Sequence, residues 1–396
     1  MLRIIRSVEE ARKELHKIGV HEDAIDIMLP KLFHFNIKFK GLLPQDAIIL
    51  KQEMLAVGGD AAISKESLPP RNFKTDVLLM GSKKQMAKVA IKLKKQYERL
   101  KKIGEEMEKL MENLNRQHEM KIGKKNFKFG KKTYIMGILN VTPDSFYDGG
   151  KYFDAEKAVE RAKQMEKEGA DIIDVGGEST RPFSEPIKAR EEMKRVLPVI
   201  EMLMDELKIP VSIDTYKPEV AEKALERGAA MINDVTALKN EKMAEIAAEY
   251  DVPVCIMHMK GEPKNMQINP SYEDVMEEIY EFLKERIEFA IRKGIDEKKI
   301  IVDPGIGFGK RTGGGIEDNC DIIAHLMELK SLGKPILVGI SRKTFIGNIT
   351  KTSVEERLEG SLGAEAIAIA NGADIIRCHD VLATKRMAMV VDAIVR

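Results

Sequence analysis

The stretch YIMGILNVTPDSFYDGG, residues 134–150, joins an apolar run to a polar loop. The run is rich in Ile and shows little alternation of polar and apolar residues. That pattern is typical of a strand buried on both faces of a parallel sheet. The run ends at Asn140, and the loop after it carries Thr, Ser, two Asp and a pair of glycines. The stretch therefore predicts a buried strand whose exit leads into a polar loop.

Seven further apolar runs of this kind follow, at residues 171–177, 210–215, 231–235, 253–259, 300–305, 335–341 and 374–380. Amphipathic segments separate them, and strict alternation of strand and helix implies a parallel sheet covered by helices. Eight such units in residues 133–396 favour a closed (β/α)₈ TIM barrel, an α/β fold. An open doubly wound sheet is the alternative. The glycine fingerprint of dinucleotide-binding sheets does not follow the first strand, which weakens that alternative.

The first third of the chain has a different pattern, which predicts a small α/β domain of unknown role over residues 1–120. Residues 2–6 (LRIIR) indicate a short strand, and Ser7 indicates the N-cap of a helix, with Glu10 completing a capping box. Strands are expected at 33–39 and 75–81, and a helix is expected at 44–59, ended by Gly58 and Gly59. A single long helix is expected over residues 82–114.

Two segments that precede the barrel have more than one interpretation. Residues 116–132 are rich in lysine, and we expect a solvated linker or hairpin over residues 121–132; binding of an acidic partner is the alternative. The segment KQEMLAVGGDAA (residues 51–62) indicates a helix ended by a Gly-Gly turn. The alternative is that the turn binds a small molecule. Neither segment gives the domain a function.

Composition limits the possible partners and the location. The net charge is +1, which gives no support for a nucleic-acid partner. No apolar run reaches the roughly 18 residues that a membrane span needs, so no membrane partner is expected. The three cysteines are far apart and form no Cys-x-x-Cys pair, so neither a zinc site nor a disulfide framework is indicated. A cytoplasmic location is the simplest expectation.

Polar side chains stand at the end of nearly every predicted barrel strand, and in a barrel these positions share the C-terminal rim where active sites lie. Carboxylate and amide side chains at the rim can hydrogen-bond to the N–H and C=O edges of a planar heterocycle. Lysine, arginine and histidine side chains there can bind phosphate. The Asn140 amide oxygen could help to hold Mg²⁺. The rim therefore predicts a site for a small molecule with a heteroaromatic ring and a phosphate group, built from Asn140, Asp214, Asn233, Asp303, Lys343, Arg377 and His379.

From about Phe127 onward the chain resembles the dihydropteroate synthase family. MGILNVTPDSFYDGG and DIIDVGGESTRP resemble the two signature segments of that family. Five other segments follow the family pattern in the same order, namely SIDTYKPEVAEKALERGAAMINDV, HMKGEPKNMQ, DPGIGFGK, GISRKTFIG and RCHDV. The resemblance covers the whole barrel, about two-thirds of the chain. It implies the condensation of 6-hydroxymethyl-7,8-dihydropterin pyrophosphate with p-aminobenzoate, giving 7,8-dihydropteroate and pyrophosphate.

The resemblance also implies roles for individual residues. It assigns pterin binding to Asp214, Asn233, Asp303 and Lys343, with Met257 or Met259 and Phe308 lining the pocket. It places Arg377 against the ring and, with His379 and Asn140, beside the pyrophosphate, with Mg²⁺ at Asn140. Two loops would close over the site and shape the p-aminobenzoate pocket, and they carry Asp144, Phe146, Asp148, Ser179, Thr180 and Arg181. Thr344 would contact the p-aminobenzoate carboxylate.

The implied chemistry needs no strong base, because an arylamine is neutral and nucleophilic near pH 7. Loss of pyrophosphate would leave a cation at the pterin methylene, and the Asp148 carboxylate would stabilise it. Catalysis would rest on positioning and on charge stabilisation by Asp148, Lys343, Arg377 and His379. The family further implies a homodimer.

Two departures from the family pattern leave alternatives open. Phe183 follows ESTRP where the family usually has Gly, and residues 311–315 form a glycine-rich segment that we expect to be a flexible surface insertion. A phosphate cradle there is disfavoured, because no Walker-type lysine and Ser/Thr pair follows. The alternative functions are a methyltetrahydrofolate-to-corrinoid methyltransferase and a barrel that binds a pterin without catalysis.

Overall fold

The computed structural model describes residues 4–5, 7–32, 34–67, 73–114, 117–141, 151–178, 185–262 and 264–396. The chain divides into two compact units, Met1–Asn115 and Arg116–Arg396. The boundary lies a few residues before the expected one at residue 120, because the hairpin that follows it packs against the second unit.

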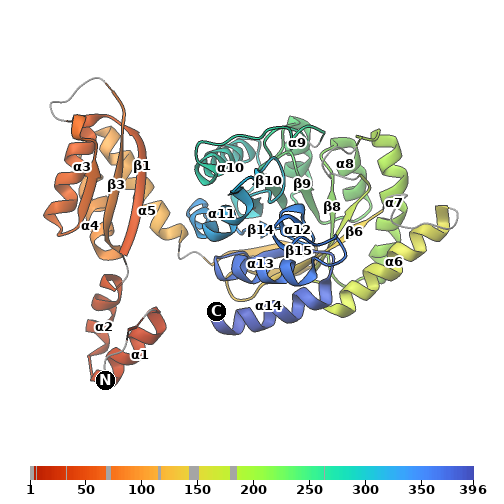
Figure 1. The fold of residues 1–396 in the computed structure, drawn as a ribbon, viewed down its shortest axis with the longest axis horizontal. Helices are drawn as coiled ribbons and strands as arrows, with labels where there is room; N and C mark the ends of the chain where they lie inside the picture. Colours follow the sequence, from red (N-terminus) through yellow and green to blue (C-terminus); the bar gives the residue numbers. More distant parts are fainter. Residues whose placement is uncertain are drawn as a thin grey trace. The chain divides into compact units, whose positions relative to one another are not determined.

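The first unit is a small α/β domain built on a three-stranded antiparallel sheet of order β1-β3-β2 (Figure 1). Ser7 caps the first helix by accepting a hydrogen bond from the backbone N–H of Glu10, at 3.1 Å. The expected Gly-Gly turn ends α3, with Gly58 at φ +79°. Ile4 and Ile5 lie in no strand, so the short strand expected there does not form at these two residues. The elements are α1 (Val8–Ile18), α2 (Glu22–Met28), β1 (His34–Leu42), α3 (Pro44–Ala56), β2 (Asp60–Ile63), β3 (Thr75–Ser82), α4 (Lys83–Leu93) and α5 (Glu98–Asn113).

The prediction of one long helix over residues 82–114 was wrong, because the chain breaks between α4 and α5. The two helices pack closely where Gly104 faces α4: a Cβ at Gly104 would lie 2.7 Å from the carbonyl oxygen of Ala90. Arg99, at the start of α5, forms an ion pair of 2.9 Å with the buried Asp46 of α3. Packing and this ion pair therefore favour two helices over one.

The second unit is the predicted barrel. Its parallel sheet has the order β11-β10-β9-β8-β7-β6-β15-β14, and a parallel bridge between Val302 and Ile336 closes it. All eight predicted strands are present, and the seventh is the shortest. They are β6 (Tyr134–Asn140), β7 (Ile172–Gly176), β8 (Val211–Asp214), β9 (Met231–Asp234), β10 (Val254–Met257), β11 (Ile300–Asp303), β14 (Leu337–Val338) and β15 (Ile375–Cys378).

Helices surround this sheet, as Figure 1 shows. Their apolar faces and the strands' outward side chains form one continuous core, which includes Val196, Ile279 and Ala368. Because neighbouring strands are parallel, their C-terminal ends lie at one rim. The helices are α6 (Lys151–Glu168), α7 (Ala189–Glu206), α8 (Pro218–Glu226), α9 (Glu241–Glu249), α10 (Val275–Arg292), α11 (Asp318–Ala324), α12 (Thr344–Thr350), α13 (Leu358–Ala370) and α14 (Val381–Val395).

The lysine-rich segment before the barrel is a hairpin of β4 (Glu119–Ile122) and β5 (Lys125–Lys128). It is not a fully solvated connector: Phe127 and Phe129 are buried against residues at the starts of the barrel strands. Their rings lie 4.7 and 5.4 Å from that of Tyr134. Burial of two Phe side chains against the barrel contributes several kcal/mol, about 1.5–3 kcal/mol each. The hairpin therefore closes the N-terminal end of the barrel.

The glycine-rich insertion also has regular structure. It forms a short hairpin of β12 (Thr312–Gly313) and β13 (Ile316–Glu317). The guanidinium of Arg311, just before it, pairs with both carboxylate oxygens of the buried Asp318, at 2.8 to 3.1 Å. The insertion lies at the surface, as expected, and its glycines are exposed in a regular hairpin. Among the helices that the structure describes, none is long and apolar enough to cross a membrane.

Candidate active site

Five predicted site residues meet at the C-terminal rim of the barrel. Arg377 on β15 is the centre of the cluster: its Nε donates to Asp174 Oδ2 at 2.7 Å, and its Nη2 donates to Asp214 Oδ2 at 2.6 Å. Asn233 on β9 donates its side-chain N–H to the same Asp174 oxygen, at 2.9 Å. Side chains of β7, β8, β9 and β15 thus form one hydrogen-bonded network.

This network contains two carboxylates and one guanidinium, so one negative charge is in excess. Burial raises the pKa of Asp214 to about 7, although Arg377 acts in the opposite direction. The pKa of Arg377 is raised because Asp174 and Asp214 outweigh its own burial. The second oxygens of Asp174 and Asp214 are both buried, and neither has a hydrogen-bond partner among the described residues. Unpaired buried acceptors are costly, so these oxygens are suited to receive N–H groups of a ligand.

Asp303 and Lys343 form the other side of the site. Asp303 ends β11, and its Oδ1 accepts a hydrogen bond from the backbone N–H of Gly305, at 2.7 Å. Burial raises the pKa of this carboxyl group. Lys343 precedes α12, donates to the carbonyl oxygen of Ile306, and lies 4.3 Å from the centre of the Phe308 ring. Burial lowers the pKa of Lys343 to about 8, and Asp303 partly offsets the effect.

The remaining predicted residues lie around these two groups. Met257 is buried at the end of β10, Met259 and Phe308 are half-buried, and Thr344 is exposed at the start of α12. Asn140 ends β6 and is half-buried. His379 follows β15, and its Nδ1 lies 3.1 Å from Ser341 Oγ. The predictions for Asp144, Phe146, Asp148, Ser179, Thr180, Arg181 and Phe183 fall outside the described residues.

The sequence interpretation missed two buried charged residues of this rim, Asp174 and Lys310. Asp174 lies inside the apolar run of β7 and is fully buried. A charged residue within such a run is itself a signal, because a buried charge needs a partner. Lys310 follows the glycine-rich turn after β11 and is also buried, and burial lowers its pKa to about 7.

Asp234, a further strand-end acid, has a structural role. Its carboxylate accepts hydrogen bonds from the backbone N–H groups of Thr236 and Leu238, both at 2.8 Å, and from the Thr236 hydroxyl at 2.7 Å. These bonds hold the turn after β9, where Ala237 and Leu238 have positive φ. Asp234 therefore stabilises the loop and is separate from the cluster around Arg377.

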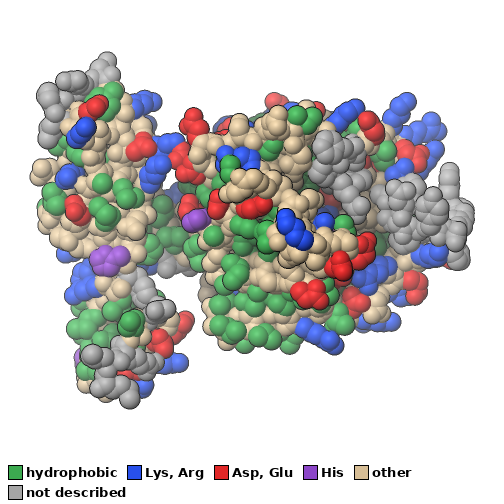
Figure 2. Space-filling view, in the orientation of Figure 1, with side chains coloured by type: hydrophobic (Ala, Val, Ile, Leu, Met, Phe, Trp, Pro, Cys, Tyr) green, Lys and Arg blue, Asp and Glu red, His purple; other side chains and the backbone are tan. Residues whose placement is uncertain are grey.

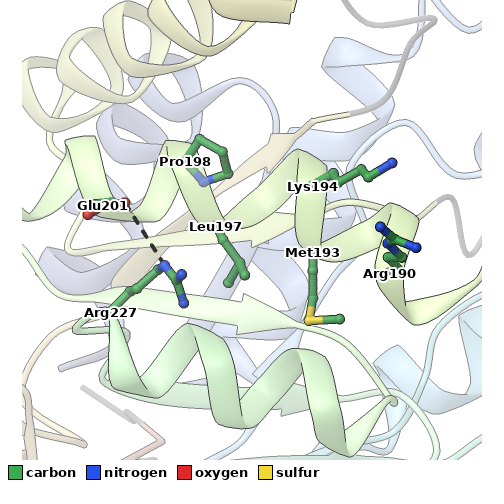
Figure 3. A pocket seen from close by; sticks show the side chains of 7 residues that line it. All are labelled: Arg190, Met193, Lys194, Leu197, Pro198, Glu201 and Arg227. Atoms are coloured by element: carbon green, nitrogen blue, oxygen red, sulfur yellow. Dashed lines mark ion pairs between the residues drawn. The ribbon is translucent and has the colours of Figure 1, made fainter.

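A hollow of about 310 Å³ lies elsewhere, on the outer helices (Figure 3). Its lining comes from α7 and the end of α8, and an ion pair of 4.0 Å joins Glu201 and Arg227 across it. Met193 and Leu197 supply the apolar surface. The cluster of charged groups at the strand ends, rather than this hollow, has the features of a reaction site.

Comparison with known proteins agrees with this geometry. Residues 136–379 match the family described as pterin binding enzyme. A dihydropteroate synthase of Clostridium beijerinckii is 50% identical over 265 residues, which is 66% of this chain and 94% of the relative. The Xanthomonas albilineans dihydropteroate synthase with 4-aminobenzoic acid is 42% identical, with a TM-score of 0.66 over 70% of this chain and 98% of that chain. The same enzyme in complex with 7,8-dihydropteroate is 41% identical, with a TM-score of 0.63 over the same shares.

The family match begins at residue 136, so the first unit, Met1–Asn115, lies outside it. The match runs from within β6 to the end of β15 and covers every residue of the cluster around Arg377. The chain therefore belongs to the dihydropteroate synthase family of pterin binding enzymes.

Proposed function

We propose that the barrel acts as a dihydropteroate synthase, a transferase of folate biosynthesis. It joins 6-hydroxymethyl-7,8-dihydropterin pyrophosphate to p-aminobenzoate and releases pyrophosphate. The observation that carries this proposal is the convergence of Asp214, Asn233, Asp303, Lys343 and Arg377 at one rim. Two buried carboxylate oxygens there, those of Asp174 and Asp214, have no hydrogen-bond partner within the part of the chain that the structure describes, and they can accept ring N–H groups.

The pterin ring would lie between the two sides of the site. Its ring N–H and amino groups would donate to Asp214 and Asp303, because both side chains are buried acceptors. The Lys343 ammonium would exchange its bond to the Ile306 carbonyl for the ring's acceptor atoms. The Arg377 guanidinium would lie against the ring, with Met257 or Met259 and Phe308 supplying the apolar walls.

The leaving group needs positive charge at the rim. We propose that Arg377 and His379 stabilise the departing pyrophosphate, since both extend from the end of β15. Mg²⁺ would neutralise part of the pyrophosphate charge, with the Asn140 amide oxygen as a ligand. The described residues contain no cluster of three or more His, Cys, Asp or Glu that could hold a metal ion. One neutral protein oxygen fits Mg²⁺ that is held mainly by substrate phosphate and water.

The nucleophile is the amine of p-aminobenzoate, which is neutral at pH 7 and needs no general base for attack. We propose that Asp148 stabilises the cation at the pterin methylene. The p-aminobenzoate pocket would be formed by the two loops that carry Asp144, Phe146, Ser179, Thr180 and Arg181. The exposed hydroxyl of Thr344 would contact the carboxylate of this substrate.

We further propose a homodimer formed through α13 and α14. Hydrophobic side chains gather over these two helices in Figure 2. Six large apolar residues are exposed there, at 42 to 76% of their surface, and a contiguous apolar patch on a folded domain usually marks an interaction surface. They are Ile367, Leu382, Met389, Val390, Ile394 and Val395. Sedimentation equilibrium should give twice the chain mass, and Met389→Asp should shift it toward the monomer.

A cytoplasmic location is also proposed. Cys255, Cys320 and Cys378 are all free thiols in the structure, which suits a reducing compartment.

The experiment that tests the proposed function is Lys343→Ala. We expect this change to reduce kcat/KM for the pterin substrate about a hundredfold or more, because it removes the ammonium that acts on Asp303 and lies 4.3 Å from the centre of the Phe308 ring. Melting temperature and circular dichroism should stay close to those of the unmodified protein. Full activity in Lys343→Ala would contradict the assignment of this rim as the pterin site.

The second candidate is methyl transfer from methyltetrahydrofolate to a corrinoid protein. It would also use acidic contacts to a pterin. The cationic groups of Lys343 and Arg377, together with the imidazole of His379, favour a substrate with a pyrophosphate group instead. An assay with a corrinoid acceptor separates the two, because only the second candidate would methylate cobalt.

A further inference from the structure

The turn after β11, Gly305–Gly309, is held by side chains at every one of its carbonyl oxygens. Lys310 Nζ donates to the carbonyls of Gly305 and Phe308, at 3.0 and 2.9 Å. Gln267 donates to Gly307 at 2.7 Å, and Tyr272 donates to Gly309 at 2.6 Å. The remaining carbonyl, that of Ile306, accepts from Lys343. Five consecutive carbonyls thus each accept a side-chain hydrogen bond.

The backbone of this turn permits no ordinary side chain at two of its glycines. Gly305 and Gly309 have φ of +70° and +60°. A Cβ at Gly305 would lie 1.9 Å from the carbonyl oxygen of His258, and one at Gly309 would lie 2.3 Å from that of Lys260. The turn is therefore pressed against the exit of β10, and its position depends on the groups that bind it.

Lys310 is the group that joins the turn to the exit of β10. Its ammonium has three N–H bonds and three acceptors: two carbonyls of the turn, and the Nδ1 of His258 at 3.0 Å. Burial lowers the pKa of His258 to about 2, so the ring is neutral, and Nδ1 accepts from the ammonium in the tautomer whose proton is on Nε2. Both side chains are almost fully buried, which makes an unpaired group here costly.

Three groups of the pterin site depend on this turn. The Asp303 carboxylate is fixed by the N–H of Gly305, the resting position of Lys343 is fixed by the carbonyl of Ile306, and Phe308 is itself a residue of the turn. We propose that Lys310 is a positioning residue for the pterin substrate: it holds the turn so that Asp303, Lys343 and Phe308 present the geometry that the ring needs. This inference rests on the proposed function and adds a residue that acts without touching the substrate.

The test compares Lys310→Met with Lys334→Met. Lys334 is also buried, but its Nζ donates to the carbonyl of Glu297 at 2.6 Å, before the start of β11 and so at the other end of the barrel. We expect Lys310→Met to raise KM for the pterin pyrophosphate on the order of tenfold or more, while KM for p-aminobenzoate stays within about twofold. Lys334→Met should lower the melting temperature and leave both KM values unchanged.

An unchanged KM for the pterin substrate in Lys310→Met would overturn the inference, as would an equal rise in both KM values. Lack of turnover by the unmodified protein would count against the proposed function instead, so the two failures are distinguishable. If Lys310→Met does not fold, the pair His258→Phe and His258→Gln replaces it. The Phe variant removes the acceptor and should raise KM for the pterin substrate, whereas the Gln variant supplies an oxygen acceptor and should restore it. Equal pterin KM values in these two variants would contradict the role of the Lys310–His258 bond.

Discussion

Arg377 and Asp214 form an ion pair of 2.6 Å at the mouth of the barrel, although 163 residues separate them in the chain. The same guanidinium also holds Asp174, so one cation serves two buried carboxylates. Pairing of β15 with β6 creates this arrangement, because it brings Arg377 within reach of the side chains at the ends of β7 and β8. The pair therefore links the stability of the barrel to the chemistry of its rim.

Arg377→Met should destabilise the protein by about 3–5 kcal/mol, because it leaves buried carboxylates without their cation. Urea denaturation followed by circular dichroism measures this loss. Arg227→Met is the matched control: Arg227 forms a longer, more exposed ion pair with Glu201 on the outer helices, and its loss should cost less than about 1 kcal/mol. Equal losses of unfolding free energy in the two variants would show that the ion pairs of Arg377 with Asp174 and Asp214 stabilise the protein no more than an exposed ion pair does.

The pH profile of kcat/KM for the pterin substrate should be bell-shaped. The acid limb should lie near pH 7, where Asp214 becomes a carboxylate that can accept ring N–H groups. The alkaline limb should lie near pH 8, where Lys343 loses its proton. Lys343→Arg should remove the contribution of residue 343 to the alkaline limb, since an arginine stays charged there. A flat profile from pH 6 to 9 would be inconsistent with these two groups.

Lys217→Met should raise KM for p-aminobenzoate more than KM for the pterin substrate. Lys217 binds both Glu178 and Glu192, and Glu178 also accepts from the Tyr216 hydroxyl at 2.7 Å and from the backbone N–H of Ile187 at 3.2 Å. Glu178 and Ile187 flank the segment that carries the predicted Ser179, Thr180 and Arg181. Steady-state kinetics with each substrate varied in turn measures the effect. Lys223→Met, which removes an exposed pair with Glu226, is the control and should change neither KM.

Glu365→Gln should stabilise the protein at pH 8.5 and have little effect at pH 4.5. Burial raises the pKa of Glu365 to about 8, and its Oε2 accepts from the Thr384 hydroxyl at 3.0 Å. The pKa of Glu365 is higher in the folded protein than its ordinary value. The contribution of this group to the free energy of unfolding is therefore fully present below about pH 4.5 and is lost as the pH rises through about 8. A glutamine does not ionise, so we expect the free energy of unfolding of Glu365→Gln to exceed that of the unmodified protein by about 2–4 kcal/mol at pH 8.5. Identical pH dependence of unfolding in both proteins would refute the prediction.

The sequence predicted the barrel well because each strand is an apolar run bounded by polar residues. The rim residues Asp214, Asn233, Asp303, Lys343 and Arg377 followed from that pattern, since each stands at or near the end of a run. The parts that failed depend on contacts between distant segments. The break between α4 and α5 rests on the close approach of Gly104 to Ala90 and on the ion pair between Arg99 and Asp46, which no local pattern encodes.

Asp174 and Lys310 were missed for the same physical reason. Each is a charged residue within or next to an apolar segment, and its role becomes visible only when the partners are known. The hairpin β4–β5 is a further case: its lysines predicted exposure, whereas its alternate apolar residues, Met120, Ile122 and Phe127, are buried against the barrel. Sequence spacing gives the strand, but it does not show which face meets the barrel.

The most direct test of the account is product formation by the unmodified protein. Purified protein with Mg²⁺, 6-hydroxymethyl-7,8-dihydropterin pyrophosphate and p-aminobenzoate should release pyrophosphate and give 7,8-dihydropteroate in equal amounts, measured by mass spectrometry. Omission of p-aminobenzoate should abolish dihydropteroate formation. Absence of dihydropteroate with all components present, together with methyl transfer to a corrinoid protein, would contradict the account.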